Sequence, residues 1–515
     1  MTNNFLKIHK NDILIMIGLF CLGIISRYIF RGDILYHWDS INFAYGIQEF
    51  NVAKGQPHVP GYILYVYLTK LVDIFFADAQ ITITTISCIS SGLAIAWLYL
   101  LGKDMFNQRV GLYAAFFLAS SPLFWFYGEI ALPHSLDTLG VILAAWLLYK
   151  LRQGHTQYLV PCAVWLGIAG GMRPQTQVFL APLILFAGWP LLWKRAFIAV
   201  AVVGVIDLLW FVPLLWLNGG PDAYFATMGA FSDRFQTTTN VLKGAGWFGF
   251  TRNVTKLALY TLYAWSLPLI PVILAEAKLL YTGQFRTSAF IKDNRLWFAT
   301  LWIAPSFIYY LLIHMGQQGL VFVYLPMLLL LSAVAVDYLT EAPLTYRQMG
   351  MALLVLGNCI IFVLLPTYPL GSTSPKLLTV ETLRRHDSYY QNRFDTINQE
   401  FPANNTVILA TNWRFPQYYL PEYSLRPYTL ISKRELGAGA PVVGKATLTA
   451  TELGITPTIQ GDVYVVIFDN DILPFNQSAD RIKTTVMPNG EQLSYLQMKA
   501  DEHLYVGPDA YWIME

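Results

Sequence analysis

Charged residues are scarce in this sequence of 515 residues. Asp, Glu, Lys and Arg together make up 13% of it, whereas 55% of the residues are hydrophobic. Soluble domains average about 25% charged residues, so this composition excludes an ordinary soluble protein and predicts an integral membrane protein. The 34 basic residues nearly balance the 32 acidic ones, and no basic patch stands out. A nucleic-acid partner is therefore not expected.

Cysteine is also rare. The four cysteines all lie inside apolar runs, where they behave as small hydrophobic residues, so neither a disulfide nor a thiolate metal site is predicted. The sequence contains no Walker loop, GxSxG, HExxH or CxxC motif. ATP-driven transport, serine hydrolysis and zinc-protease chemistry therefore lack their usual sequence motifs.

Long apolar runs dominate the first two thirds of the chain. Such runs predict transmembrane helices, and residues 1–366 are expected to form a mainly α-helical, polytopic bundle of about eleven spans. Lys7 and Lys10 place the N-terminus in the cytoplasm, and every second loop is basic, as the positive-inside rule requires. The predicted spans are residues 13–30, 80–101, 110–127, 136–150, 158–171, 177–192, 196–217, 257–275, 296–313, 319–337 and 349–366. We expect the bacterial inner membrane as the location.

Two parts of the sequence are not predicted to span the membrane. The run Gly61–Asp78 is interrupted by Lys70 and Asp73, which favours an interfacial or re-entrant helix. Residues 367–515 contain no spanning run and predict a smaller α/β domain, which an odd number of spans places on the outer side. Within it, Thr406–Thr411 and Asp462–Phe468 are strand-like, and Thr379–Phe401 has a helical pattern.

Ionisable residues gather on the predicted outer side, where they are expected to face a functional cavity because such groups are costly at membrane depth. The first of them is Asp39, which begins a short helical pattern. Asp is a favoured helix N-cap, and a capping carboxylate can also face a pocket, so the two roles are compatible. In "PHVPGY" (Pro57–Tyr62) two prolines hold His58 on a stiff turn.

Further candidates stand at the ends of predicted spans, where polar residues can also simply mark the water boundary. Arg173 in "GGMRPQT" is either a boundary residue that snorkels or a phosphate clamp. For Asp137 the boundary role is favoured. The remaining candidates are His37, Glu129, His134, His314 and Gln317. A divalent metal is conceivable among the histidines and carboxylates, but no local ligand spacing supports one.

The arrangement of these motifs resembles the GT-C superfamily of membrane glycosyltransferases, nearest the protein O-mannosyltransferase and aminoarabinose-transferase branch. The resemblance rests on the acidic residue of the first outer loop, on "PHVPGYILY", on "GMRP" at Gly171–Pro174 and on "HMGQQGLVFVYLP" at His314–Pro326. One departure is Ser40, since the mannosyltransferases carry a second acidic residue there. That departure favours the broader bacterial group.

The resemblance implies transfer of a sugar from a polyprenyl-phosphate donor, with Asp39 as the general base. His37, His58, Glu129, His134, Arg173, His314 and Gln317 would then bind substrate. The acceptor would be a lipid, glycan or protein on the outer side, and membrane lipids would surround the enzyme. The alternative is a non-enzymatic membrane protein, such as a lipid-linked saccharide transporter or an assembly subunit. A transporter should show matching halves with charges near the midplane, and no internal repeat stands out.

Overall fold

The computed structural model divides into two compact units. Unit 1 comprises Met1–Asp33 and Asn42–Leu383, and unit 2 comprises Ile34–Ile41 and Arg384–Glu515. A short segment of the predicted first outer loop is thus part of the C-terminal unit. The structure describes residues 9–189, 191–283, 293–339, 344–366, 368–369, 376–430, 444–445, 447–449, 463–469, 481–499, 503–505 and 511–514.

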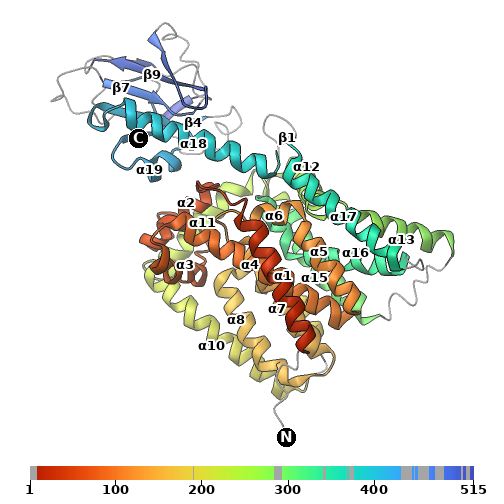
Figure 1. The fold of residues 1–515 in the computed structure, drawn as a ribbon. Helices are drawn as coiled ribbons and strands as arrows, with labels where there is room; N and C mark the ends of the chain where they lie inside the picture. The colour runs from red at the N-terminus through yellow and green to blue at the C-terminus, as the bar shows by residue number, and fades with distance from the viewer. Residues whose placement is uncertain are drawn as a thin grey trace. The chain divides into compact units, whose positions relative to one another are not determined.

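Unit 1 is a bundle of helices (Figure 1). Its α-helices are α1 (Lys10–Tyr28), α2 (Trp38–Gln48, which begins in unit 2), α3 (Ile63–Phe76), α4 (Ala79–Met105), α5 (Gln108–Ser120), α6 (Pro122–Tyr127), α7 (His134–Arg152), α8 (Leu159–Met172), α9 (Pro174–Gly188), α10 (Trp193–Leu217), α11 (Pro221–Gln236), α12 (Gly246–Trp265), α13 (Leu269–Tyr281), α15 (Asn294–Leu312), α16 (Leu325–Leu339) and α17 (Leu344–Leu364). Short 3₁₀ helices are η1 (Thr156–Tyr158), η2 (Val241–Lys243) and η3 (Gln318–Val323), and β1 (Tyr368–Pro369) pairs with β2 (Lys376–Leu377).

The centre of this bundle is α4, which packs against α1, α5 and α7. Glycine permits the closest of these approaches. A Cβ at Gly111 of α5 would lie 2.4 Å from the carbonyl oxygen of Tyr99 on α4, which no side chain tolerates. Small residues at helix crossings are typical of membrane bundles, where close van der Waals packing drives helix association.

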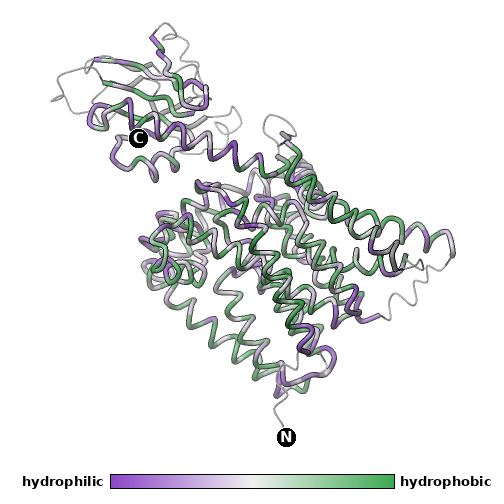
Figure 2. Tube along the Cα trace, in the orientation of Figure 1, coloured by the Kyte–Doolittle hydropathy of each residue, from purple (hydrophilic) through white to green (hydrophobic). Residues whose placement is uncertain are grey.

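The helices of unit 1 fit a multi-pass integral membrane protein, as predicted. Hydrophobic residues predominate along them (Figure 2). Among the described residues, α1, α4 and α10 are each long and apolar enough to cross a membrane, and α12 with α13 would make a fourth span that bends by 95°. Large apolar side chains of α10 are exposed, for example Trp216 at 81%, as expected for a surface that faces lipid.

The apolar runs predicted as spans correspond to helices, but three of them are interrupted. The predicted run 110–127 is divided between α5 and α6, the run 257–275 is broken between α12 and α13, and the run 319–337 is divided between η3 and α16. Pro122 and Pro268 stand at the first two breaks, and proline cannot donate the backbone hydrogen bond that continues a helix. The run Gly61–Asp78 contains α3, which at 14 residues is too short to span a bilayer.

Unit 2 has the α/β composition that the sequence predicts. Its largest sheet has the strand order β5-β11-β4-β3-β7-β9-β8, in which β3 is parallel to β4 and β7. The other strand pairs of the described residues in unit 2, including β10 with β6, are antiparallel. The elements are α18 (Val380–Glu400), η4 (Ala403–Asn405), β3 (Thr406–Ala410), α19 (Arg414–Tyr419), β4 (Ser424–Leu430), β5 (Gly444–Lys445), β6 (Thr447–Thr449), β7 (Val463–Ile467), β8 (Lys483–Val486), β9 (Gln492–Met498), β10 (His503–Tyr505) and β11 (Tyr511–Met514).

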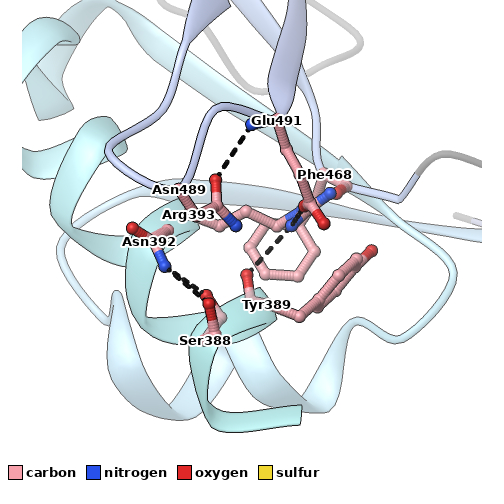
Figure 3. Close-up of polar contacts among 7 residues, drawn as sticks. All are labelled: Ser388, Tyr389, Asn392, Arg393, Phe468, Asn489 and Glu491. Carbon is pink, nitrogen blue, oxygen red and sulfur yellow. Dashed lines mark hydrogen bonds and ion pairs between the residues drawn. The ribbon is translucent and has the colours of Figure 1, made fainter. Parts of the chain in front are cut away.

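Arg393 fixes α18 to this sheet (Figure 3). Its side chain is fully buried and donates hydrogen bonds to the carbonyl oxygens of Phe468 (3.1 Å) and Tyr389 (2.9 Å). Glu491 lies 3.1 Å from the same guanidinium and neutralises it. Because Nε and Nη1 have partners and Glu491 supplies the opposite charge, the buried charge is compensated and α18 has a defined orientation on the sheet.

Candidate functional site

The start of α2 is capped by His37. The Asp39 backbone N–H donates to His37 Nδ1 (3.0 Å), and the His37 N–H donates to Ser40 Oγ (3.3 Å). These two bonds resemble a capping box. The His37 ring accepts from the N–H of the second helical residue, and the side chain three residues after the cap accepts from the His37 N–H. Asp39 Oδ2 lies 3.5 Å from the same nitrogen, so the Asp39 carboxylate and the His37 ring are neighbours at the helix start.

Asp39 itself is not the N-cap that the sequence pattern suggested. The helix begins at Trp38, so Asp39 lies in the first turn and His37 is the cap. A carboxylate in the first turn is favoured by the positive end of the helix dipole. Its side chain is 18% exposed, which leaves the carboxylate accessible on one side.

The turn that carries His58 is enclosed by aromatic and apolar side chains. The His58 ring contacts Phe43 and Tyr62 edge-on, with ring centroids 5.8 and 5.2 Å away, and stacks on Phe231 at 6.2 Å. The hydroxyl of Tyr224 on α11 donates to the Pro60 carbonyl (3.0 Å). The turn is thereby joined to the long loop region after α10, a contact that its sequence motif does not reveal.

Arg173 forms a buried ion pair with Asp137. Arg173 Nη1 lies 2.6 Å from Asp137 Oδ2, and the Thr176 hydroxyl donates to the other carboxylate oxygen. Arg173 is 6% exposed, so it does not snorkel to a boundary. Its Nε has no hydrogen-bond partner among the residues that the structure describes. Asp137, for which the sequence favoured a boundary role, is thus the residue that holds this arginine in place.

Asp137→Asn is expected to lower the free energy of unfolding by about 3 kcal/mol, because removal of one partner leaves a buried charge uncompensated. The thermal midpoint of the purified variant measures this loss. Replacing both residues, as Asp137→Asn with Arg173→Met, should cost less than the sum of the two single changes. Strict additivity would mean that the ion pair contributes nothing to stability.

The motif "GMRP" and the turn with His58 are neighbours in the fold, as the resemblance implies for parts of one site. A Cβ at Gly171 would lie 2.6 Å from Leu64 Cγ and 2.8 Å from Trp210 Cγ, so only glycine admits this contact. The Tyr62 phenol acts electrostatically on Arg173. The two segments, more than a hundred residues apart in the sequence, therefore meet at the end of α8.

Glu129 and His134 are both buried, at 0% and 4% exposure. The Glu129 carboxylate interacts electrostatically with the guanidinium of Arg27 on α1, which also donates to Ser91 Oγ (3.1 Å). The His134 ring lies against Tyr127 with ring centroids 5.0 Å apart, and a Cβ at Gly319 would lie 2.3 Å from it. Both side chains are thus enclosed by neighbouring residues, and their predicted part in substrate binding stays a prediction.

A cluster of basic side chains lies beside His314. Arg252 and Lys256 are one helical turn apart on α12, and both are partly buried. Arg252 donates to the Met315 carbonyl (3.2 Å), whereas Lys256 makes no hydrogen bond or ion pair within the described part of the chain. His314 Nδ1 lies 3.1 Å from Thr239 Oγ1. We call Arg252, Lys256 and His314 the basic cluster.

The environment of the basic cluster disfavours protonation of His314. Burial and the positive charges of Arg252 and Lys256 lower the pKa of His314 from 6.5 to about 4. Gly316 leaves room for the imidazole, since a Cβ there would lie 2.7 Å from His314 Nε2. Gln317, predicted with His314, directly precedes η3 in the same loop. Sequence reasoning missed Arg252 and Lys256, although their spacing of four residues already predicts one helix face.

No three potential metal-ligating side chains of His, Cys, Asp or Glu come together in the described ranges. Asp39 and His37 belong to unit 2, whereas His58, Glu129, His134, Arg173, His314 and Gln317 belong to unit 1. A metal site built from these candidates is therefore not assigned, and their roles stay predictions.

Comparison with known proteins supports the resemblance drawn from the motifs. Residues 58–216 match the family described as dolichyl-phosphate-mannose-protein mannosyltransferase. That range contains both the "PHVPGY" turn and the "GMRP" motif. None of the curated proteins compared with the chain matches it.

Solved structures share the fold of nearly the whole chain. ArnT from Cupriavidus metallidurans bound to undecaprenyl phosphate is 13% identical, with a TM-score of 0.57 over 95% of this chain and 98% of its own. The apo state of the same protein gives 13% identity and a TM-score of 0.56 over the same shares. The Archaeoglobus fulgidus oligosaccharyltransferase in its apo form is 12% identical, with a TM-score of 0.47 over 88% of this chain and 69% of its own. These matches agree with the resemblance drawn from the motifs, and the chain is a multi-pass membrane protein that shares the fold of ArnT.

Proposed function

We propose that this protein transfers a sugar from a polyprenyl-phosphate donor to a hydroxyl group of an acceptor on the outer face of the membrane. The acceptor oxygen attacks the anomeric carbon, the bond from that carbon to the phosphate oxygen breaks, and the polyprenyl phosphate leaves. Asp39 accepts the proton of the attacking hydroxyl. Direct displacement of this kind inverts the anomeric configuration.

The observation that most directly supports a phosphate-linked donor is the basic cluster. Lys256 is partly buried without an ion-pair partner in the described chain, and the nearest charge that acts on it is the like charge of Arg252. Holding two cations together without an acid is unfavourable unless an anion binds there. A phosphate accepts charge-assisted hydrogen bonds from both side chains and removes this repulsion. The undecaprenyl phosphate bound by ArnT is a lipid of the chemical class proposed here.

In the proposed reaction five further side chains have defined tasks. Arg252 and Lys256 bind the phosphate of the donor and stabilise the charge that develops as it leaves. Arg173, whose Nε has no hydrogen-bond partner in the described ranges, provides a further donor for the phosphate or the sugar. His58 and Gln317 orient the sugar.

The test is turnover by the purified protein in lipid nanodiscs. A panel of polyprenyl-phosphate sugars is offered with lipid, glycan and peptide acceptors, and release of polyprenyl phosphate is measured. Release that depends on an acceptor, with inverted anomeric configuration by NMR, supports the proposal. Retention would contradict direct displacement, and the absence of release from every donor would favour transport or assembly instead.

Donor binding is expected to become stronger as the pH falls from 6.5 towards 4. His314 is neutral over most of this pH range, because burial and the two neighbouring cations lower its pKa to about 4. A bound phosphodiester adds negative charge beside the ring and raises the pKa of His314, so binding takes up a proton in this range. The phosphodiester carries one negative charge throughout this pH range. The pH dependence of donor binding therefore comes from a group on the protein.

The donor Kd, measured by calorimetry across this pH range, should fall about tenfold in the wild type. His314→Gln, which cannot titrate, serves as the control and should bind equally well across the range. Equal pH dependence in both proteins would show that another group takes up the proton.

A further inference from the structure

The segment Ile34–Ile41 is built into unit 2, and side chains of unit 2 complete its hydrogen bonds. The Leu35 N–H donates to the Tyr419 hydroxyl at 2.9 Å, and the Ile34 N–H lies 3.4 Å from Asp387 Oδ1. The side chains of Ile34 and Leu35 are buried, at 4% and 0% exposure. Two consecutive backbone groups of the loop are thereby tied to α18 and α19.

Aromatic contacts continue along the same segment. The Tyr36 ring lies 4.8 Å from the His386 ring, and burial raises the pKa of the Tyr36 phenol. Trp38, the first residue of α2, meets Trp413 edge-to-face at 5.0 Å. Such pairs contribute beyond the apolar area they bury and fix the relative orientation of the rings. Asp39 follows Trp38 directly.

The elements that hold the segment are packed against one another. Arg393 anchors α18 to the sheet (Figure 3). The Phe394 ring on α18 stacks on the Tyr419 ring of α19, with centroids 4.8 Å apart. Tyr390 stacks on Phe415 at 4.1 Å. The Tyr419 hydroxyl, which accepts the hydrogen bond from Leu35, therefore belongs to a side chain that packs between α19 and α18.

We propose that Tyr419 and Trp413 of unit 2 are positioning residues for the general base. This inference rests on the proposed function, in which Asp39 is that base. Tyr419 and Trp413 fix where α2 begins and hence where Asp39 presents its carboxylate, although neither takes part in the reaction. Proton transfer requires hydrogen-bond reach between base and hydroxyl, so a small displacement of the helix start slows the reaction. The C-terminal unit is on this view a part of the catalytic apparatus and not an appended domain.

The experiment compares Tyr419→Phe with Tyr423→Phe in the full-length protein. Both variants remove a phenolic hydroxyl from unit 2, but the Tyr423 hydroxyl donates to the carbonyl oxygens of Ile397 (3.1 Å) and Phe401 (2.9 Å), away from the loop. Hydrogen–deuterium exchange of residues 34–41 and steady-state kinetics are measured for each. Thermal unfolding of both variants checks that unit 2 stays folded.

Tyr419→Phe should lower kcat about threefold to tenfold, the loss expected from one hydrogen bond, and leave the donor KM unchanged. Exchange at residues 34–41 should be faster than in the wild type. Tyr423→Phe should change neither quantity, and Trp413→Phe, which keeps an aromatic ring, should retain more kcat than Trp413→Leu.

Unchanged exchange and kcat in Tyr419→Phe would overturn the positioning role while the wild type still turns over donor. Equal losses in Tyr423→Phe would also overturn it, because they would assign the effect to the stability of unit 2. A wild type that turns over no donor would instead overturn the proposed function, and with it any role in catalysis.

Discussion

Asp39→Asn is expected to lower kcat by about 10²–10⁴-fold, the range that a positioned general base contributes. The amide has nearly the shape of the carboxylate but cannot accept the proton of the attacking hydroxyl. Its position in the first turn of α2 makes the change mild for the fold, since loss of the favourable dipole interaction costs about 0.3–1 kcal/mol. Donor Kd should stay at the wild-type value.

The matched control is Glu49→Gln, which removes another carboxylate close to the end of the same helix. Glu49 is exposed and pairs with Lys54 at 2.8 Å, and surface pairs of this kind contribute little. This variant should keep wild-type turnover. Full activity in Asp39→Asn would remove Asp39 from the mechanism, and loss of donor binding would show that its role is not confined to the proton.

The double variant Arg252→Gln with Lys256→Gln is expected to raise the donor Kd by about 10²–10⁴-fold. Each hydrogen bond to a charged group contributes about 1.5–3 kcal/mol, and both cations are assigned to the same phosphate. Glutamine keeps much of the side-chain length and hydrogen-bonding capacity but removes the charge. The variant should also be no less stable than the wild type, since it removes a repulsion between two partly buried cations.

Lys243→Gln is the control for this prediction, because Lys243 is an exposed lysine in the same region of unit 1. It should leave donor Kd unchanged, and the salt dependence of binding should weaken only in the double variant. Titration with the leaving product, polyprenyl phosphate, gives a second readout. An unchanged Kd for both ligands in the double variant would place the phosphate elsewhere in the protein.

Elements governed by local pattern were predictable from the sequence. The apolar runs became helices, and the regions Thr406–Thr411, Asp462–Phe468 and Thr379–Phe401 contain β3, β7 and α18. Hydrophobicity over about 20 residues and the periods of helix and strand need no knowledge of the fold. The motifs also carried the resemblance to the GT-C superfamily, with which the family match over residues 58–216 and the fold shared with ArnT agree.

The residue that caps the start of α2 was not predictable from the local sequence pattern. Asp39 was expected to cap the helix, whereas His37 does so. Both residues precede the same apolar pattern, and helix boundaries depend on which side chain reaches the free backbone donors.

What the sequence by itself determined is therefore the class of the protein: a multi-pass membrane bundle with chemistry at the ends of its helices and an α/β unit after them. Only the tertiary structure decided the partners of those chemical groups. It paired Arg173 with Asp137, gathered Arg252 and Lys256 beside His314, and placed Ile34–Ile41 within unit 2. Each of these pairings joins residues distant in the chain, and their energy depends on burial and distance, which a local pattern does not encode.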